Sequence, residues 1–390
     1  MEDKVQFELA STTWGKEEVQ AIRDVVDSNM FTMGPCVRDF EERFAQHFGM
    51  KYAVMANSGS SANLISIASL FFRKDQPLHR GDEVIVPCIS WATTFHPLQQ
   101  YGLKLKFVDI DLKTLNMDVK ELEKAISKKT KMVIAVSILG NPCRFDEITK
   151  ICRENNVMLF EDNCESMGAK LNGRYTGTFG FVNTFSTFFS HHISTMEGGL
   201  ALTNDKEMFN LLKAMRNHGW TRGQDEDSPL YEKRDNDFYE AYRFILPGYN
   251  VRPGEIHGAI GLKQLDKLDG FINIRRKNAE HFVELFKNDG RFIIQEEHGE
   301  SSWFCFTMIV NPAGKVDRGK VLQRLREANI EHRMITGGNI LRHDVIKYYD
   351  HEVTKSVNAD IAHDNGFFVG NCPYDIRDKI DYLHNTLKNL

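Results

Sequence analysis

Two adjacent histidines, of which His191 is the first, lie between two short apolar segments and suit proton transfer near neutral pH. Alternating apolar and hydroxyl residues over 182–188 predict a buried strand, and residues 200–203 predict a second one. Ser186 lies five residues before His191, and Glu197 opens a Glu-Gly-Gly triplet six residues after it. Composition alone is typical of a surface loop, but the spacing indicates a more specific site.

A small-residue turn nearer the N-terminus is a candidate anion site. Residues 52–56 predict a strand, Gly59 and Ser60 follow in an Asn-Ser-Gly-Ser-Ser turn, and residues 62–72 predict an apolar helix. A strand, a turn of small residues and a helix aim free backbone N–H groups at an anion. An ordinary turn with a serine cap explains the same pattern, so both interpretations stay open.

The histidine stretch resembles the signature of the DegT-type sugar aminotransferases, which use pyridoxal phosphate (PLP) on the aspartate aminotransferase fold. That signature reads Ser, four residues, Lys, five residues, Glu-Gly-Gly, and its lysine binds PLP as a Schiff base. Ser186 and Glu197 match, but His191 replaces the lysine. An imidazole cannot form this Schiff base, although it can transfer protons. Histidine here is typical of the sugar 3-dehydratases of the family, and the whole chain resembles those acting on GDP-linked 4-keto-6-deoxy sugars.

The resemblance implies a reaction in two halves. L-glutamate converts PLP into pyridoxamine phosphate (PMP) and leaves as 2-oxoglutarate. PMP then condenses with the C4 ketone of GDP-4-keto-6-deoxy-D-mannose, the C3 hydroxyl is expelled, and hydrolysis gives a 3,6-dideoxy-4-ketosugar and ammonia. His191 is the expected catalytic base and acid. His192 is the competing candidate, because counting back from Glu197 is good to about one position.

The resemblance also implies cofactor contacts. Gly59, Ser60 and Ser186 are expected to bind the PLP phosphate, and Trp91 is expected to stack on the pyridine ring, although a tryptophan is more often a core residue. Asp162, just after a strand predicted over residues 157–160, matches the carboxylate that keeps the pyridine nitrogen protonated. A helix cap is the alternative role for this aspartate.

Four further residues take expected roles from the same resemblance. Glu165 stands where the family usually has Gln or His beside the cofactor, as in the dehydratase branch. Asn250 matches an asparagine that reaches across a homodimer interface to the neighbouring PLP phosphate, so shared active sites are expected; a local turn is the alternative. His218 and Arg222 are expected near the substrate or glutamate, since Arg clamps carboxylates and diphosphates, but a surface Arg is equally consistent.

Composition excludes several classes of protein. The chain has 390 residues, ordinary apolar and charged content and a formal net charge of -5, which gives no reason to expect nucleic-acid binding. No apolar run approaches membrane-spanning length and the N-terminus lacks a signal-peptide pattern, so a cytoplasmic protein is expected without membrane partners. Seven dispersed cysteines without a C-x-x-C pair predict reduced thiols, no iron-sulfur cluster and no metal site.

Three alternative functions remain at this stage. A nucleotide-sugar 4-aminotransferase would need a lysine from outside the histidine stretch, which contains none. A dehydratase acting on CDP-sugars would need a cysteine-rich insertion. A non-catalytic PLP-fold binding protein would have no physical need to retain Trp91, Asp162, Ser186 and Asn250 together. No motif reads guanine, so the nucleotide rests on the overall resemblance.

Alternating strands and helices position these residues. The order predicts an α/β protein with a mainly parallel sheet, which is the aspartate aminotransferase-like, type I PLP fold with a smaller C-terminal α/β domain. Expected domains are an N-terminal arm and first helix at 1–34, a large PLP-binding domain at 35–255 and a small domain at 256–390. Further strands are predicted at 83–87, 104–108, 132–136, 303–309 and 331–334, and further helices at 16–28, 206–216, 259–268 and 318–329.

Overall fold

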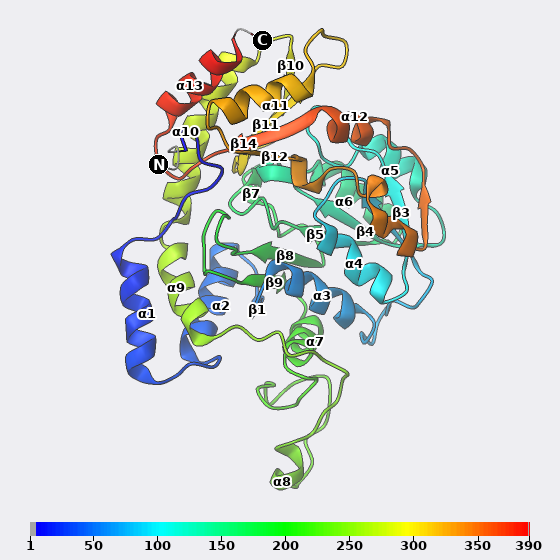
Figure 1. Cartoon of the computed structure of the whole chain (residues 1–390). Helices are drawn as coiled ribbons and strands as arrows, with labels where there is room; N and C mark the ends of the chain where they lie inside the picture. Colours follow the sequence, from blue (N-terminus) through cyan, green and yellow to red (C-terminus); the bar gives the residue numbers. More distant parts are fainter. Residues whose placement is uncertain (1–4, 389) are drawn as a thin grey trace.

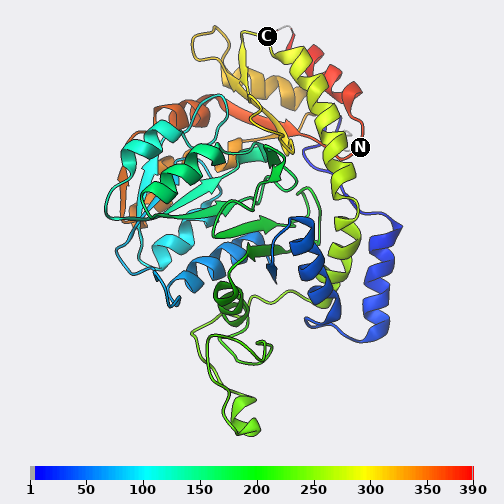
Figure 2. The same cartoon turned by 180° about the vertical axis from the view of Figure 1, so that it is seen from behind.

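A central sheet of eight strands forms the body of the protein, in a computed structural model that describes residues 5–388 and 390. Helices cover both faces of the sheet (Figures 1 and 2). Its strand order is β1-β9-β8-β5-β4-β2-β3-β13. The strands are β1 (Tyr52–Ala56), β2 (Glu83–Pro87), β3 (Lys104–Val108), β4 (Thr130–Val136), β5 (Met158–Asp162), β8 (Val182–Ser186), β9 (Gly199–Thr203) and β13 (His351–Val353).

The central sheet is parallel except around β9, which pairs antiparallel with both β1 and β8. All five residues of β2, β8 and β9 are buried, because helices cover both faces and each strand must be apolar or internally bonded on both sides. The predicted mainly parallel sheet is confirmed. The main helices around it are α2 (Pro35–His47), α3 (Gly59–Leu70), α4 (Ala92–Gln100), α5 (Val119–Ala125), α6 (Phe145–Glu154), α7 (Lys206–Arg216) and α9 (Glu255–Leu265).

A second, antiparallel sheet of four strands follows the long helix α10 (Leu268–Phe286), which runs along one side of the molecule (Figure 2). Its core contains stacked Phe282 and Phe306, and its order is β10-β11-β14-β12. Not all of residues 256–390 surround this sheet, since β13 pairs with β3 in the central sheet. The elements are β10 (Phe292–Ile294), β11 (Cys305–Val310), β12 (His332–Arg333), β14 (Gly366–Gly370), α11 (Arg318–Glu327), α12 (Val357–Asn365) and α13 (Arg377–Leu387).

Several boundaries differ from the predicted ones for local reasons. The strand expected from residue 303 begins at Cys305, because Trp303 has a φ of 45° and leaves extended geometry. The strand expected to end at residue 160 continues to Asp162, and α3 begins at Gly59 rather than 62. As a result, the candidate site residue Asp162 belongs to β5 and Gly59 belongs to α3, so the regular backbone of each element fixes how the residue is oriented.

Two segments leave the body of the molecule. The N-terminal helix α1 (Lys16–Ser28) lies on the outside beside α9, and the stretch around α8 (Asp237–Glu240) extends away from the sheet between α7 and α9 (Figure 1). No helix in the described ranges is both long and apolar enough to cross a bilayer.

Candidate active site

A cavity of about 350 Å³ opens where β5 and β8 end and where α3 and α4 begin. Ends of parallel strands are where α/β sheets bind ligands. Seven of the sequence-predicted site residues line this cavity, namely Gly59, Ser60, Trp91, Asp162, Glu165, Ser186 and His191. The three others, His218, Arg222 and Asn250, do not line it.

Asp162 ends β5 and is held by three donors. Its Oδ2 accepts hydrogen bonds from Asn63 Nδ2 at 2.9 Å and Thr94 Oγ1 at 2.7 Å, and its Oδ1 accepts from the Cys164 N–H at 3.1 Å. Thr184 Oγ1 in turn donates to Asn63 Oδ1 at 2.6 Å. A buried carboxylate needs such donors, and here they also fix its orientation in the cavity wall.

Asn63 and Thr94 were missed by the sequence analysis. Asn63 lies four residues after Gly59 on α3, so both share one helix face, which is the one signal that would have indicated it. Thr94 lies in the first turn of α4, and its hydroxyl also bonds Ser90 Oγ at 2.8 Å. Neither contact with Asp162 has a local sequence pattern, because α3, α4 and β5 are far apart in the chain.

The first turn of α3 forms a cradle with room for an anion. Ser58 caps the helix by accepting the Ser61 N–H at 3.0 Å, and the N–H groups of a first turn have no carbonyl partner within their own helix. A Cβ on Gly59 would lie 2.7 Å from Ser186 Cβ and 2.9 Å from Cys164 Sγ. Only glycine therefore lets the helix start approach β8 this closely. Ser60 Oγ lies 2.7 Å from Thr93 Oγ1, so hydroxyl groups surround the cradle.

His191 and His192 occupy different environments. His191 lines the cavity, with its ring edge-on to Phe304 at 5.2 Å and Phe188 at 5.9 Å between centroids. Burial lowers the pKa of His191 to about 4, so its imidazole is neutral at physiological pH. His192 is fully buried, does not line the cavity, and has Nε2 3.3 Å from the Ser302 carbonyl oxygen. Burial also lowers the pKa of His192 well below its ordinary value.

Glu165 connects the cavity with the C-terminal part of the chain. Its Oε2 accepts hydrogen bonds from the Leu139 N–H and from Thr336 Oγ1, both at 3.1 Å. Both donors have left-handed backbones, with φ of 53° at Leu139 and 39° at Thr336, a conformation that is costly for residues other than glycine. Burial raises the pKa of Glu165 to about 7. Thr336 is a further residue that the sequence did not indicate.

Two further features of the cavity are the exposed Trp91 ring and the lack of lysine and arginine among the described lining residues. The Trp91 side chain, at the N-cap of α4, is 59% exposed although it lines the cavity, so its ring face is free for a ligand. Among the residues that the structure describes, neither lysine nor arginine lines the cavity. Within the described part of the chain, therefore, no amine is placed to form a Schiff base there.

The three remaining candidates lie in the segment 217–252, which contains α8. We call this segment the arm; it is distinct from the N-terminal residues 1–34. The His218 N–H donates to the Tyr249 carbonyl at 2.7 Å, and His218 has a left-handed φ of 60°. The Arg222 guanidinium lies 5.3 Å from the centroid of the Trp220 ring. Asn250 Oδ1 accepts from Arg252 Nε at 2.9 Å. In one chain, none of these three residues lines the cavity.

The cavity residues fit PLP. The α3 cradle with Ser60 and Ser186 supplies donors for a phosphate, and Gly59 leaves that cradle free of a Cβ. Asp162, held by three donors, presents a carboxylate suited to a protonated ring nitrogen. All seven cysteines are free, and the described His, Cys, Asp and Glu residues form no cluster of three able to hold a metal.

Comparisons with known proteins agree with this geometry. The model of the DegT/DnrJ/EryC1/StrS aminotransferase family matches residues 12–376. GDP-4-keto-6-deoxy-D-mannose 3-dehydratase of Escherichia coli O55:H7 (strain CB9615 / EPEC) is 51% identical over 387 residues, which cover 98% of this chain and 100% of the relative. The enzyme of the same name from Yersinia pseudotuberculosis is also 51% identical, with 98% of both chains covered.

A solved structure extends the similarity to three dimensions. The crystal structure of GDP-4-keto-6-deoxymannose-3-dehydratase with a trapped PLP-glutamate geminal diamine matches with a TM-score of 0.96 and 50% identity, covering 98% of this chain and 100% of that chain. The predicted aspartate aminotransferase-like fold class is thereby confirmed.

Proposed function

The chain belongs to the DegT/DnrJ/EryC1/StrS aminotransferase family, and we propose that it removes the C3 hydroxyl of GDP-4-keto-6-deoxy-D-mannose with PLP and L-glutamate. The products are the 3,6-dideoxy-4-ketosugar, ammonia and 2-oxoglutarate. One observation carries the dehydratase assignment: His191 lines the cavity close to Asp162, and no lysine in the described chain does. A nucleotide-sugar substrate also fits the expected cytoplasmic location.

PLP, when bound, supplies an electron sink that takes up the charge released as a proton leaves the adjacent carbon. We assign its phosphate to the α3 cradle with Ser60 and Ser186, its ring face to Trp91, and its ring nitrogen to Asp162. The three hydrogen bonds on Asp162 hold that carboxylate in place without any rearrangement during the reaction. Glu165 lies on the same cavity wall and completes the expected set of cofactor contacts.

His191 moves the proton. Because burial holds its pKa at about 4, the imidazole is neutral and ready to accept a proton at physiological pH. The protonated ring is then a strong acid, suited to donate that proton to the departing C3 oxygen. A lysine at this position would instead recapture the cofactor covalently and complete a transamination. The histidine thus directs the reaction to dehydration.

The arm suggests that two chains share each active site. Glutamate carries carboxylates and the GDP-sugar carries a diphosphate, yet the described cavity wall contains neither lysine nor arginine. Arg222, His218 and Asn250 would supply donors if the arm of a second copy reached the cavity mouth. Large aromatic side chains on the arm support such a contact, since Phe238 is 92% and Tyr242 72% exposed. We therefore propose a homodimer with shared sites.

Visible absorbance tests the assignment directly. The protein is loaded with PLP, treated with borohydride, and in a separate sample given L-glutamate. The proposal expects a free-aldehyde-like spectrum, no cofactor fixed to the protein by borohydride, and conversion to the PMP spectrum by glutamate. Ammonia should then be released when GDP-4-keto-6-deoxy-D-mannose is added. A lysine adduct trapped by borohydride would overturn the histidine assignment, and a lack of PLP binding would overturn the enzyme assignment.

A further inference from the structure

A buried amide anchors the loop that carries His191. We define this loop as residues 187–198, between β8 and β9. The loop is closed on itself by Thr195, whose N–H donates to the Thr187 carbonyl at 2.9 Å and whose Oγ1 lies 2.6 Å from Thr187 Oγ1. From outside, the Ser194 N–H donates to Gln264 Oε1 at 3.0 Å, and the Ser194 carbonyl accepts from Trp14 Nε1 at 3.0 Å. Ser194 is thus held at both its backbone groups by residues remote in sequence.

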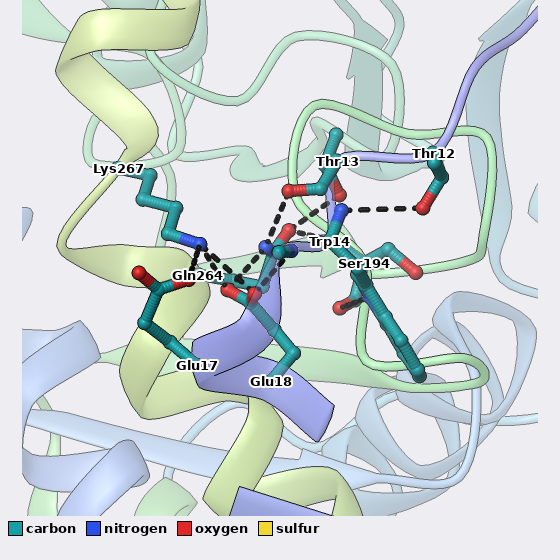
Figure 3. Close-up of polar contacts among 9 residues, drawn as sticks. Thr12, Thr13, Trp14, Glu17, Glu18, Ser194, Gln264 and Lys267 are labelled. Carbon is teal, nitrogen blue, oxygen red and sulfur yellow. Dashed lines mark hydrogen bonds and ion pairs between the residues drawn. The ribbon is translucent and has the colours of Figure 1, made fainter. Parts of the chain in front are cut away.

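Gln264 uses all of its hydrogen-bonding capacity in this anchor. It lies on α9 and is fully buried. Its Oε1 accepts from Ser194 and also from Thr13 Oγ1 at 2.5 Å, while its Nε2 donates to the Thr13 carbonyl at 3.0 Å and to Glu18 Oε1 at 2.8 Å. Figure 3 shows these bonds converging from the N-terminal segment, from α1 and from the loop. A buried amide with every donor and acceptor paired has one favourable orientation.

A charged pair holds the far side of the anchor. Lys267 Nζ lies 2.7 Å from Glu18 Oε1 and 2.9 Å from Glu18 Oε2, and Glu18 is fully buried (Figure 3). The Gly15 N–H donates to Glu18 Oε2 at 2.6 Å. Glu17 contributes at the surface only, 3.3 Å from Lys267, with its side chain 62% exposed. The N-terminal segment is therefore fastened to α9, and α9 to the loop.

We propose that Gln264 is a positioning residue that holds His191 at its working position through the backbone of Ser194. The proposal rests on the proposed function, in which His191 moves the proton. The His191 ring lies edge-on to Phe188 and Phe304, and it also interacts with the backbone of Cys164 and Ser186. These contacts orient the ring only if the loop backbone places it beside them, so the backbone anchor three residues later helps to set where the imidazole lies. Misplacement by about 1 Å is enough to cost roughly 100-fold in rate.

The test compares variants that cut different bonds of the same cluster. Gln264→Met removes the acceptor for Ser194 and keeps the side-chain length. Trp14→Phe removes the other bond to Ser194 and serves if Gln264→Met does not fold. Thr13→Val removes a bond to Gln264 but none to the loop, and Glu17→Gln changes only the exposed edge. Each intact variant is examined by thermal melting and, without cofactor, by amide hydrogen exchange followed in the proteolytic fragment that spans residues 187–198. Its kcat and KM for the GDP-sugar are then measured with PLP and glutamate.

The expected result is a split between kcat and KM. Gln264→Met or Trp14→Phe should speed amide exchange in the loop and lower kcat about tenfold or more, with KM for the GDP-sugar nearly unchanged. Thr13→Val, even if it melts at a similarly reduced temperature, should keep kcat within about twofold. Equal losses of kcat in all three, or unchanged loop exchange in Gln264→Met, would overturn the proposal. If the native protein itself does not act on the sugar, the proposed function fails, while the exchange comparison still decides the anchor.

Discussion

The cavity wall and the arm hold their candidate site residues in opposite ways. In the wall, Asp162 is buried and accepts hydrogen bonds from Asn63 and Thr94, which are remote in sequence, and from the nearby Cys164 N–H. In the arm, Arg222 lies over Trp220 and Asn250 is bonded to its near neighbour Arg252. The wall gathers its candidate cofactor contacts from one chain. In the proposed shared site, the side chains of the arm act on the active site of a second copy.

The comparison teaches where a single chain suffices. Burial of a charge demands partners at once, so the wall residues are fixed as soon as the chain folds. Exposed Arg and Asn side chains need no partner within their own chain and remain available to bind at the site of a second copy. The proposed division of labour therefore gives cofactor chemistry to the wall and the recognition of anionic substrates to the arm, and the predictions below test it.

Replacing His191 should have the largest effect. His191→Lys is expected to lower the dehydration rate by about 10²–10⁴-fold, because general acid-base catalysis at this position is lost. The new amine should also bind PLP covalently. Ammonia release measures the first effect, and mass spectrometry after borohydride measures the second. His192→Asn is the matched comparison, and a rate loss confined to that variant would reverse the assignment of the two histidines.

Removing the charge of Asp162 should have the next largest effect. Asp162→Asn keeps the shape but removes the negative charge assigned to the ring nitrogen, so kcat should fall by about 10²–10³-fold while PLP still binds. Thr94→Val deletes only one of the three hydrogen bonds and should cost tenfold or less. The comparison of kcat in the two variants separates charge from orientation. Equal losses would contradict the role of the charge.

The raised pKa of Glu165 predicts a pH-dependent stability. Since burial raises this pKa from 4.5 to about 7, the folded state keeps a proton that the unfolded state loses between those values. Stability due to Glu165 is therefore present below about pH 4.5 and is lost as pH rises through 7. Glu165→Gln should gain about 1–3 kcal/mol relative to the native protein between pH 4.5 and 8.

Urea unfolding of the cofactor-free proteins at several pH values measures this gain. The lowered pKa of His191 makes stability rise between about pH 4 and 6.5, but this contribution is common to both proteins and cancels in the difference. Glu226→Gln, an exposed carboxylate of the arm, is the matched control. If the stabilities of the native and Glu165→Gln proteins changed with pH in parallel, the raised pKa of Glu165 would be contradicted.

Mixed dimers give the smallest but most direct test of the comparison. His191→Asn and Asn250→Asp chains are refolded together. If Asn250 serves the partner's site, each mixed dimer contains one site with both residues intact, and about a quarter of the native activity returns. Mixing His191→Asn with Asp162→Asn should restore nothing, because both residues belong to the same wall. Recovery in the second mixture, or none in the first, would contradict the shared site.

Local patterns in the sequence determined much of this protein. Apolar periodicity predicted β1, β2, β3, α1 and α7 with the bounds that the structure has, because spacing along the chain is what makes one face of an element apolar. The spacing of His191, five residues after Ser186 and six before Glu197, identified it as a site residue, and the structure places it on the cavity wall.

Tertiary structure alone decided the rest. Asn63 and Thr94 reach Asp162 across 99 and 68 residues, and Thr336 reaches Glu165 across 171. The same holds for β13, which joins the central sheet from the C-terminal part, and for Gln264, which bonds Ser194 from 70 residues away. Such contacts leave no periodic signal, because they depend on which strands and helices become neighbours. That choice is made by packing of the whole chain and not by any local stretch of it.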